Sequence, residues 1–192
     1  MSAERRIELP DEYSWKELDS IKARFPMPQN WFFKEAVAPG TKAFFISREP
    51  IQGDSFTASL AGMRYKTNRP EGFFTTGLSI NVFPDFYRRM RRSPAAVARE
   101  FMNNSPKELT PESRVSFVRD SAITTLRRFF RSDVPVIMGR KMGPTNYYIE
   151  FSANTSTQTL YTMMFETPSD KWENDIEIAR MMIENRQLDQ SV

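Results

Sequence analysis

Histidine and cysteine are both absent from this chain of 192 residues. Without cysteine there can be no disulfide, thiolate metal cluster or thiol nucleophile. Without histidine there is no imidazole base and no side chain whose ordinary pKa lies near neutral pH. Most metal sites and most covalent or proton-shuttling active sites depend on these two residues. We therefore predict a binding or assembly protein that is not an enzyme and has no catalytic residues, no metal and no cofactor.

Long apolar runs are missing as well. No stretch approaches the roughly 18 apolar residues of a membrane-spanning helix, and the opening residues MSAERRIE lack the apolar core of a secretory signal. The seven glycines are scattered, and none forms the Gly-rich turn of a phosphate or dinucleotide site. We expect no membrane span and a cytoplasmic location, or an organellar one if a targeting segment was removed.

The composition is that of a folded globular protein. The chain is 40% hydrophobic and 27% charged, and its 16 Phe, 6 Tyr and 3 Trp residues are far more than a disordered chain carries. A chain of this length can bury one core without disulfides or metals. We predict a single domain over residues 19–192. Residues 1–18 are predicted to form an N-terminal arm or a short helix, because Ser14 and Glu17 have the spacing of a capping box.

Alternation of apolar and polar residues predicts most of the strands. A hairpin is expected from residues 21–25 and 31–33, and a third strand from Lys42 to Ser47. The segment from Glu49 to Gly72 is predicted to be a long loop with a short strand at 56–60. Further strands are expected at residues 74–83, 134–138, 146–152 and 159–165.

Three helices are predicted by a hydroxyl residue followed by proline. These pairs are Ser93-Pro94, Thr110-Pro111 and Thr167-Pro168. Acidic residues early in the third helix suit the positive end of its dipole. Strands mixed with helices, without a regular βαβ alternation, predict an α+β domain with a central antiparallel sheet and helices packed on its faces.

The order of these motifs resembles the PsbP-like superfamily, which includes photosystem II extrinsic proteins, bacterial DcrB-type proteins and a Ran-binding import factor. The residues that carry the resemblance are 21–31, 77–83, 94–104, 134–137 with Gly139, 147–151, 159–161 and the helix that begins around Lys171-Trp172. The resemblance implies a sheet between helices and a binding or assembly role without catalysis. Residues 49–72 and the predicted helix at 110–130 depart from it as insertions, and no functional residue is carried over.

Two arginine clusters are the candidate interaction residues. Arg88, Arg89, Arg91 and Arg92 lie between a predicted strand and a predicted helix, where guanidinium groups can bind carboxylates or phosphates in pairs. The alternative is a solvated loop.

The second cluster, Arg127, Arg128 and Arg131, is interleaved with Phe129 and Phe130, as in surfaces that bind single-stranded nucleic acid. The alternative is that these two phenylalanines are part of the core. In the run Trp31-Phe32-Phe33 only one side can be buried, so Phe32 is a further candidate contact.

Two functional hypotheses follow. The first is a protein-binding accessory or assembly factor that contacts an acidic partner protein through Arg88–Arg92 and the segment Glu49–Gly72. The alternative is a single-stranded nucleic-acid-binding protein that uses both arginine clusters. Convergence of the clusters on one face would favour a polyanionic ligand. No pair of acidic residues sits in a recognisable catalytic motif, so a carboxylate-dependent enzyme is the least favoured hypothesis.

Overall fold

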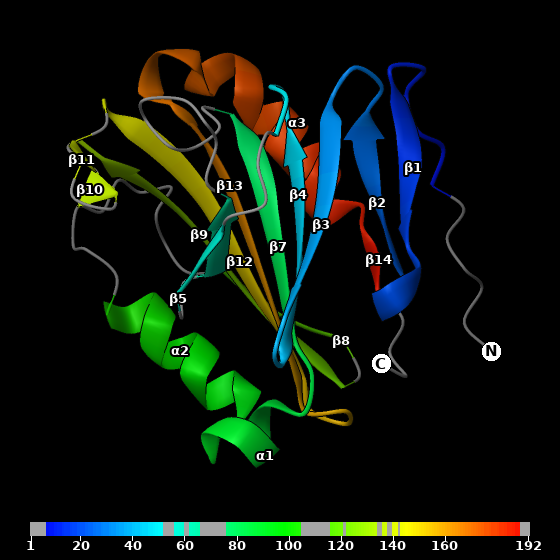
Figure 1. Cartoon of the computed structure of the whole chain (residues 1–192), viewed down its shortest axis with the longest axis vertical. Helices are drawn as coiled ribbons and strands as arrows, with labels where there is room; N and C mark the ends of the chain where they lie inside the picture. Colours follow the sequence, from blue (N-terminus) through cyan, green and yellow to red (C-terminus); the bar gives the residue numbers. More distant parts are fainter. Residues whose placement is uncertain are drawn as a thin grey trace.

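A central antiparallel sheet with helices on both faces forms the protein (Figure 1). The computed structural model describes residues 7–51, 56–59, 62–65, 76–104, 116–120, 122–133, 136–137, 140–141 and 143–188. One face of the sheet is covered by helix α2, and the other by helix α3 and a small second sheet. The predicted α+β class, with an antiparallel sheet and helices packed on its faces in one domain, is confirmed.

The main sheet contains seven strands. Their order across the sheet is β3 (Phe32–Ala38), β4 (Thr41–Ser47), β7 (Gly77–Phe83), β13 (Thr159–Pro168), β12 (Thr145–Asn154), β9 (Ile123–Ser132) and β8 (Ser116–Asp120). All neighbouring pairs are antiparallel. The predicted strands at 42–47, 146–152 and 159–165 are confirmed, as is the second part of the one at 74–83.

The second sheet contains the N-terminal strand and the last described strand of the chain. Its order is β1 (Tyr13–Leu18), β2 (Ala23–Pro28) and β14 (Gln187–Leu188), with the short 3-10 helix η1 (Asp19–Ile21) between β1 and β2. The helix alternative for residues 1–18 is therefore wrong for the segment 13–18. Glu17 does not cap a helix, because it faces Arg24 on β2 at 3.9 Å.

The predicted hairpin of residues 21–25 with 31–33 is wrong. Strand β2 pairs with β1 and β14, whereas β3 pairs with β4 in the main sheet. The chain changes layers at the turn between them, where the Trp31 N–H donates to the Pro28 carbonyl (3.1 Å). The Trp31 ring then stacks on Phe165 of β13 at 6.4 Å between centroids. Alternation predicted the strands but could not tell that they belong to two layers.

The predicted helix at 110–130 is wrong over its described part. Thr110-Pro111 lies outside the described residues, and residues 116–120 and 123–132 are strands β8 and β9. Cross-strand aromatic pairs stabilise β9 against β12: Phe129 stacks on Tyr148 (4.3 Å) and Phe130 on Tyr147 (4.6 Å). Phe129 and Phe130 thus pack on the two apolar clusters on opposite sheet faces, as the core alternative predicted.

The other two predicted helices are present, but the predicted start of the last one is wrong, because Thr167 and Pro168 end strand β13 and Lys171 precedes the helix without a side-chain cap. Helix α2 spans Pro94–Asn104, and the Ser93 hydroxyl caps it by accepting from the Ala96 N–H (3.2 Å). Helix α3 spans Trp172–Glu184 after the 3-10 turn η3 (Ser169–Lys171). Among the residues that the structure describes, no helix is long and apolar enough to cross a membrane.

Four short strands complete the description. They are β5 (Phe56–Ser59), paired with β6 (Gly62–Tyr65), and β10 (Val136–Ile137), paired with β11 (Arg140–Lys141). The β5–β6 hairpin confirms a strand inside the predicted segment Glu49–Gly72, most of whose other residues lie outside the described ranges.

Candidate interaction surface

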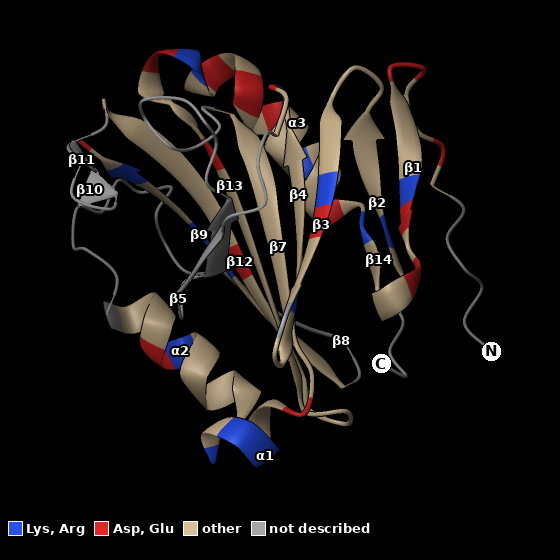
Figure 2. Ribbon diagram, in the orientation of Figure 1, with Lys and Arg blue, Asp and Glu red and all other residues tan. Residues whose placement is uncertain are grey.

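A five-residue helix, α1 (Phe86–Met90), lies at one end of the molecule and carries Arg88 and Arg89 of the first arginine cluster, and Arg91 and Arg92 follow it directly (Figure 2). Phe86 is its buried anchor: the ring contacts Phe83 edge-on at 6.2 Å, and the N–H donates to the Gln158 carbonyl (2.8 Å). Asp85 (φ +50°) and Arg91 (φ +55°) flank the helix in the left-handed conformation. Because this region is costly for residues other than glycine, the helix is held in a specific shape by its surroundings.

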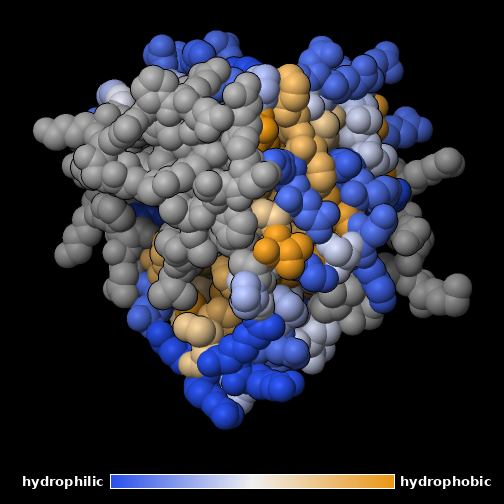
Figure 3. Space-filling view, viewed as in Figure 1, coloured by the Kyte–Doolittle hydropathy of each residue, from blue (hydrophilic) through white to orange (hydrophobic). Residues whose placement is uncertain are grey.

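The outward side chains of this segment combine cations with large apolar groups. We define the α1 surface as Tyr87, Arg88, Arg89, Met90, Arg91 and Arg92. All six are exposed, Tyr87 by 51% and Met90 by 44%. In the space-filling view this lower end is mostly hydrophilic (Figure 3). Exposed apolar residues inside a basic patch are typical of a recognition surface rather than of a loop that only adds solubility.

Most of the charge on the α1 surface is not neutralised within the described part of the chain. Arg92 forms an ion pair with Glu100 of α2, but no described acidic side chain pairs with Arg88, Arg89 or Arg91. Arg89 instead lies against the turn between β3 and β4. A Cβ atom on Gly40 would fall 1.3 Å from the Arg89 Nη1 atom, and Gly40 itself has φ +79°. Glycine at this turn therefore lets Arg89 rest on it.

The second arginine cluster does not join the first. Arg127 and Arg128 are adjacent on β9, so their side chains point to opposite faces of the sheet. The Arg127 Nε donates to the Glu150 Oε2 atom (2.6 Å), whereas the Arg128 Nη1 donates to the Met102 carbonyl at the end of α2 (2.8 Å). Arg131 is exposed and pairs with Asp133 (2.8 Å). These side chains do not form one basic face with α1.

Phe32 lies apart from both clusters. It begins the edge strand β3 and is 45% exposed, whereas its neighbour Phe33 packs on the core. The turn that contacts Arg89 follows the other end of the same strand. Phe32 is therefore an exposed aromatic group, as predicted, but it does not extend the α1 surface.

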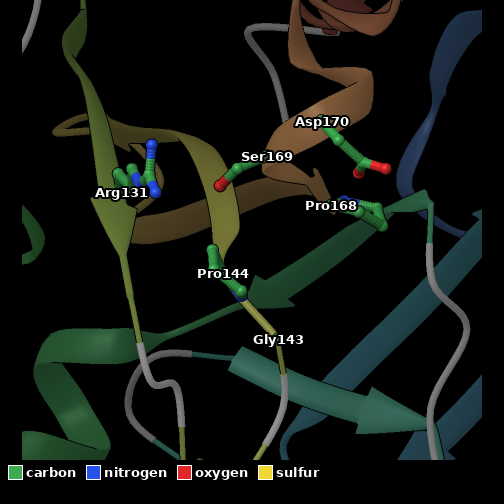
Figure 4. A pocket seen from close by; sticks show the side chains of 6 residues that line it. All are labelled: Arg131, Gly143, Pro144, Pro168, Ser169 and Asp170. Atoms are coloured by element: carbon green, nitrogen blue, oxygen red, sulfur yellow. The ribbon is translucent and has the colours of Figure 1, made fainter.

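A shallow pocket of about 490 Å³ lies near the start of α3 (Figure 4). It is lined by Arg131, Gly143, Pro144, Pro168, Ser169 and Asp170. The Ser169 N–H donates to the Pro144 carbonyl (2.9 Å), and the Ser169 hydroxyl donates to the side-chain oxygen of Asn146 (2.6 Å). Asp170 is the one acidic residue among its lining side chains, whereas carboxylate-based hydrolysis needs two. Within the described ranges, no three acidic residues gather as a metal site would require.

Comparison with known proteins gives matches in structure alone. No protein-family model and no curated protein matches the chain. Its structure is similar to the solution structure of cyanobacterial PsbP (CyanoP) from Synechocystis sp. PCC 6803, with TM-score 0.49 and 10% identity over 93% of both chains. The expected PsbP-like resemblance is thus confirmed as a structural similarity.

A second similar structure is the Ran-binding protein Mog1p of Saccharomyces cerevisiae. The TM-score is 0.44 and the identity is 9% over 92% of this chain and 95% of that one. A protein from Bacteroides thetaiotaomicron gives TM-score 0.41 and 11% identity over 87% of this chain and 45% of that one. At these identities no residue and no partner is transferred to this chain.

A buried ionic network, which the sequence analysis missed, fixes the C-terminal segment to the sheet. Glu150 of β12 is fully buried between Arg127 and Arg186, and it also accepts a hydrogen bond from the Ser152 hydroxyl (2.9 Å). Burial lowers the pKa of Arg186, although Glu150 acts against this shift. For Arg127 burial is the largest single cause and lowers the pKa, but Glu150, together with Tyr148 and Glu184, raises it, and the pKa lies above its ordinary value. The signal for this network in the sequence is Glu150, the one acidic residue inside an otherwise uncharged strand.

Tyr148 adds a titrating group beside this network. Its hydroxyl donates to the Glu184 Oε1 atom (3.0 Å). Burial is the largest cause that raises the pKa of Tyr148 well above its ordinary value; Arg127 opposes the shift, and Glu150 and Glu184 reinforce it. Since the folded state keeps the proton longer than the unfolded state, this stabilisation is complete below about pH 10 and is lost as the pH rises above it.

Replacing this hydroxyl should change the alkaline stability of the protein. We expect Tyr148→Phe to cost about 0.5–1.5 kcal/mol at neutral pH, because one hydrogen bond is lost. Above about pH 10 the stability of the wild type should fall more steeply with pH than that of the variant. The difference between the two slopes should be up to about 1.4 kcal/mol per pH unit. Urea unfolding between neutral pH and about pH 11 measures both effects. Tyr87→Phe, at an exposed position, is the control. Equal alkaline slopes for wild type and Tyr148→Phe would contradict the expectation.

Proposed function

We propose that this protein is a non-catalytic accessory or assembly factor that binds another protein through the α1 surface. The observation that carries the proposal is the exposure of Tyr87 and Met90 beside Arg88, Arg89 and Arg91, which have no acidic partner among the described residues. Tyrosine, methionine and arginine are enriched in protein interfaces, whereas lysine is depleted. Tyrosine and arginine are also frequent among the residues that dominate binding energy.

The energetics of the isolated surface support a partner of opposite charge. Four arginines lie within five residues, and only Arg92 has an acidic partner among the described residues, so their positive charges repel one another. Arg91 adds the cost of a left-handed backbone conformation. Carboxylates of a partner would offset the repulsion through paired hydrogen bonds to guanidinium groups. An acidic partner surface is therefore the proposed complement, with the segment Glu49–Gly72 as a second proposed contact region.

The nucleic-acid alternative has less support. Binding of a single strand requires a positively charged groove that follows several phosphates. Arg127 and Arg128 are used inside the fold, one by Glu150 and one by the Met102 carbonyl. We expect a single-stranded oligonucleotide to bind weakly, and a steep fall of its affinity with added salt would be the sign of the alternative function.

The cytoplasmic location also stays a prediction, which imaging of a fluorescent fusion would test.

Site-specific photo-cross-linking tests the proposed function. The full chain would carry p-benzoylphenylalanine in place of Tyr87 or, as a control, in place of the exposed Glu173 of α3. In extracts of cells that contain the protein, we expect a discrete cross-linked protein from position 87 and not from position 173. The double change Arg88→Glu with Arg91→Glu should remove that product, as quantified by mass spectrometry.

A matched charge control separates a specific contact from a general effect of charge. Arg99→Glu with Lys171→Glu removes the same amount of positive charge at exposed positions on α2 and η3. The cross-link from position 87 should survive in this variant. Identical cross-linked products from positions 87 and 173, or equal losses in both double variants, would overturn the proposal.

A further inference from the structure

We infer that the α1 surface recognises a short acidic segment of a partner protein that also presents an apolar side chain to Tyr87 and Met90. This inference rests on the proposed function and adds the chemistry of the partner. Its basis is that apolar and cationic groups are interleaved on one short helix, so that a ligand which contacts either kind must also meet the other.

The short helix fixes this interleaving. Tyr87 is a surface neighbour of Met90, three residues on in α1, and Arg88 and Arg89 lie between them in the chain. Arg91 follows the helix in a left-handed conformation, and its N–H donates to the Tyr87 carbonyl (2.8 Å). Cations therefore lie within and directly after the segment that carries the apolar pair. A complementary segment needs an apolar side chain with carboxylates within about one helical turn of it, because α1 is only about 7 Å long.

Arg89 and the adjoining turn extend the surface on another side. The Arg89 guanidinium lies on Gly40 rather than on an acidic side chain, so its hydrogen-bonding groups are not used in an ion pair within the described ranges. Val37, three residues before Gly40, is 68% exposed. A planar guanidinium suits a carboxylate because two parallel hydrogen bonds can form. Val37, near the end of β3, is thus an exposed apolar group close to the turn that Arg89 of α1 contacts.

The size of the surface favours a peptide segment over other polyanions. An anionic membrane surface binds a broad basic and apolar face, whereas α1 and the adjoining turn offer only Tyr87, Met90 and Val37 as large exposed apolar groups. A nucleic-acid strand needs a row of cations along its backbone. The arginines here are gathered around one helix of five residues.

Fluorescence anisotropy with defined probes tests the inference on the full-length protein. The first probe is a labelled peptide of alternating Glu, Asp and Leu with one Phe, and the second is the same peptide with Gln and Asn in place of the acids. We expect the amide peptide to bind at least about tenfold more weakly, since a tenfold change corresponds to one good charge-assisted contact. Tyr87→Ala, and separately Arg88→Glu with Arg91→Glu, should each weaken the acidic peptide about tenfold.

A control variant, a folding test and two competing ligands make every outcome decisive. Arg99→Glu with Lys171→Glu should leave the affinity for the acidic peptide within about twofold, and unchanged thermal unfolding would show that each variant is folded. Equal affinity for both peptides, or no effect of the α1 changes, would overturn the inference. So would tighter binding to phosphatidylglycerol vesicles or to a thymidine oligonucleotide than to the acidic peptide. If one of these results overturns the inference while the cross-link from position 87 persists, the protein-binding function stands and only the partner chemistry fails.

Discussion

Glu150→Ala should lower the free energy of unfolding by about 3–5 kcal/mol, the range measured when one member of a buried ion pair is removed. Glu150 is fully buried, and it is the shared acceptor of Arg127 and Arg186. Its removal leaves the Arg186 side chain, which is only 9% exposed, without its counter-ion. The Arg186 Nη2 atom would retain the Ser152 hydroxyl at 3.0 Å, which cannot neutralise the charge. Chemical denaturation at neutral pH measures the loss.

Two comparisons identify the cause of that loss. Glu173→Ala removes an exposed carboxylate from α3 and should change stability by less than about 0.5 kcal/mol. Glu150→Leu combined with Arg127→Met and Arg186→Met replaces the whole network by apolar groups and should recover most of the stability. A loss below about 1 kcal/mol for Glu150→Ala, with an unchanged denaturant slope, would show that the network does not hold the C-terminal segment as argued.

Strands could be predicted from alternation where both flanks carried turn residues. This worked for Lys42–Ser47 and for the long central strands β12 and β13, whose residues are uncharged almost throughout. It failed for residues 116–132, because apolar residues at 115, 118, 122 and 126 also fit a helix. The aromatic pairs between β9 and β12 stabilise the strand, and these contacts join residues distant in sequence. Long-range pairing of this kind cannot be read from one segment.

Only part of the candidate site could be predicted from the sequence. Four arginines within five residues predict an exposed cluster, and the structure places all four at the surface. Tyr87 and Met90 were missed, because an apolar residue in a single sequence is by default assigned to the core. Their exposure follows from α1, which turns Phe86 inward and leaves them outside. The roles of Arg127 and Arg128 could not be predicted, since they depend on Glu150 and on the end of α2.

The second ion pair should give the next largest effect on stability. Asp175 of α3 is 2% exposed and accepts two hydrogen bonds from Arg48, at 2.5 and 3.3 Å, and one from the Thr167 hydroxyl at 2.6 Å. Thr167 in turn contacts the Thr76 hydroxyl at 3.0 Å. Asp175 thus joins α3 to the strands beneath it. This role adds to the favourable interaction with the positive end of the helix dipole that the sequence indicated. We expect Asp175→Ala to cost about 2–3 kcal/mol in urea unfolding, the value of hydrogen bonds to a charged group.

The two partners of this pair should not respond equally. When Asp175 is removed, Arg48 can turn into water, because its side chain is already 36% exposed and lies beside the Trp31 ring. When Arg48 is removed, the Asp175 side chain, only 3% exposed, stays buried with its charge. Arg48→Ala should therefore cost at least as much as Asp175→Ala, and the double variant should cost less than the sum. Additive effects in this cycle, or a smaller cost for Arg48→Ala, would mean that the buried carboxylate does not depend on Arg48.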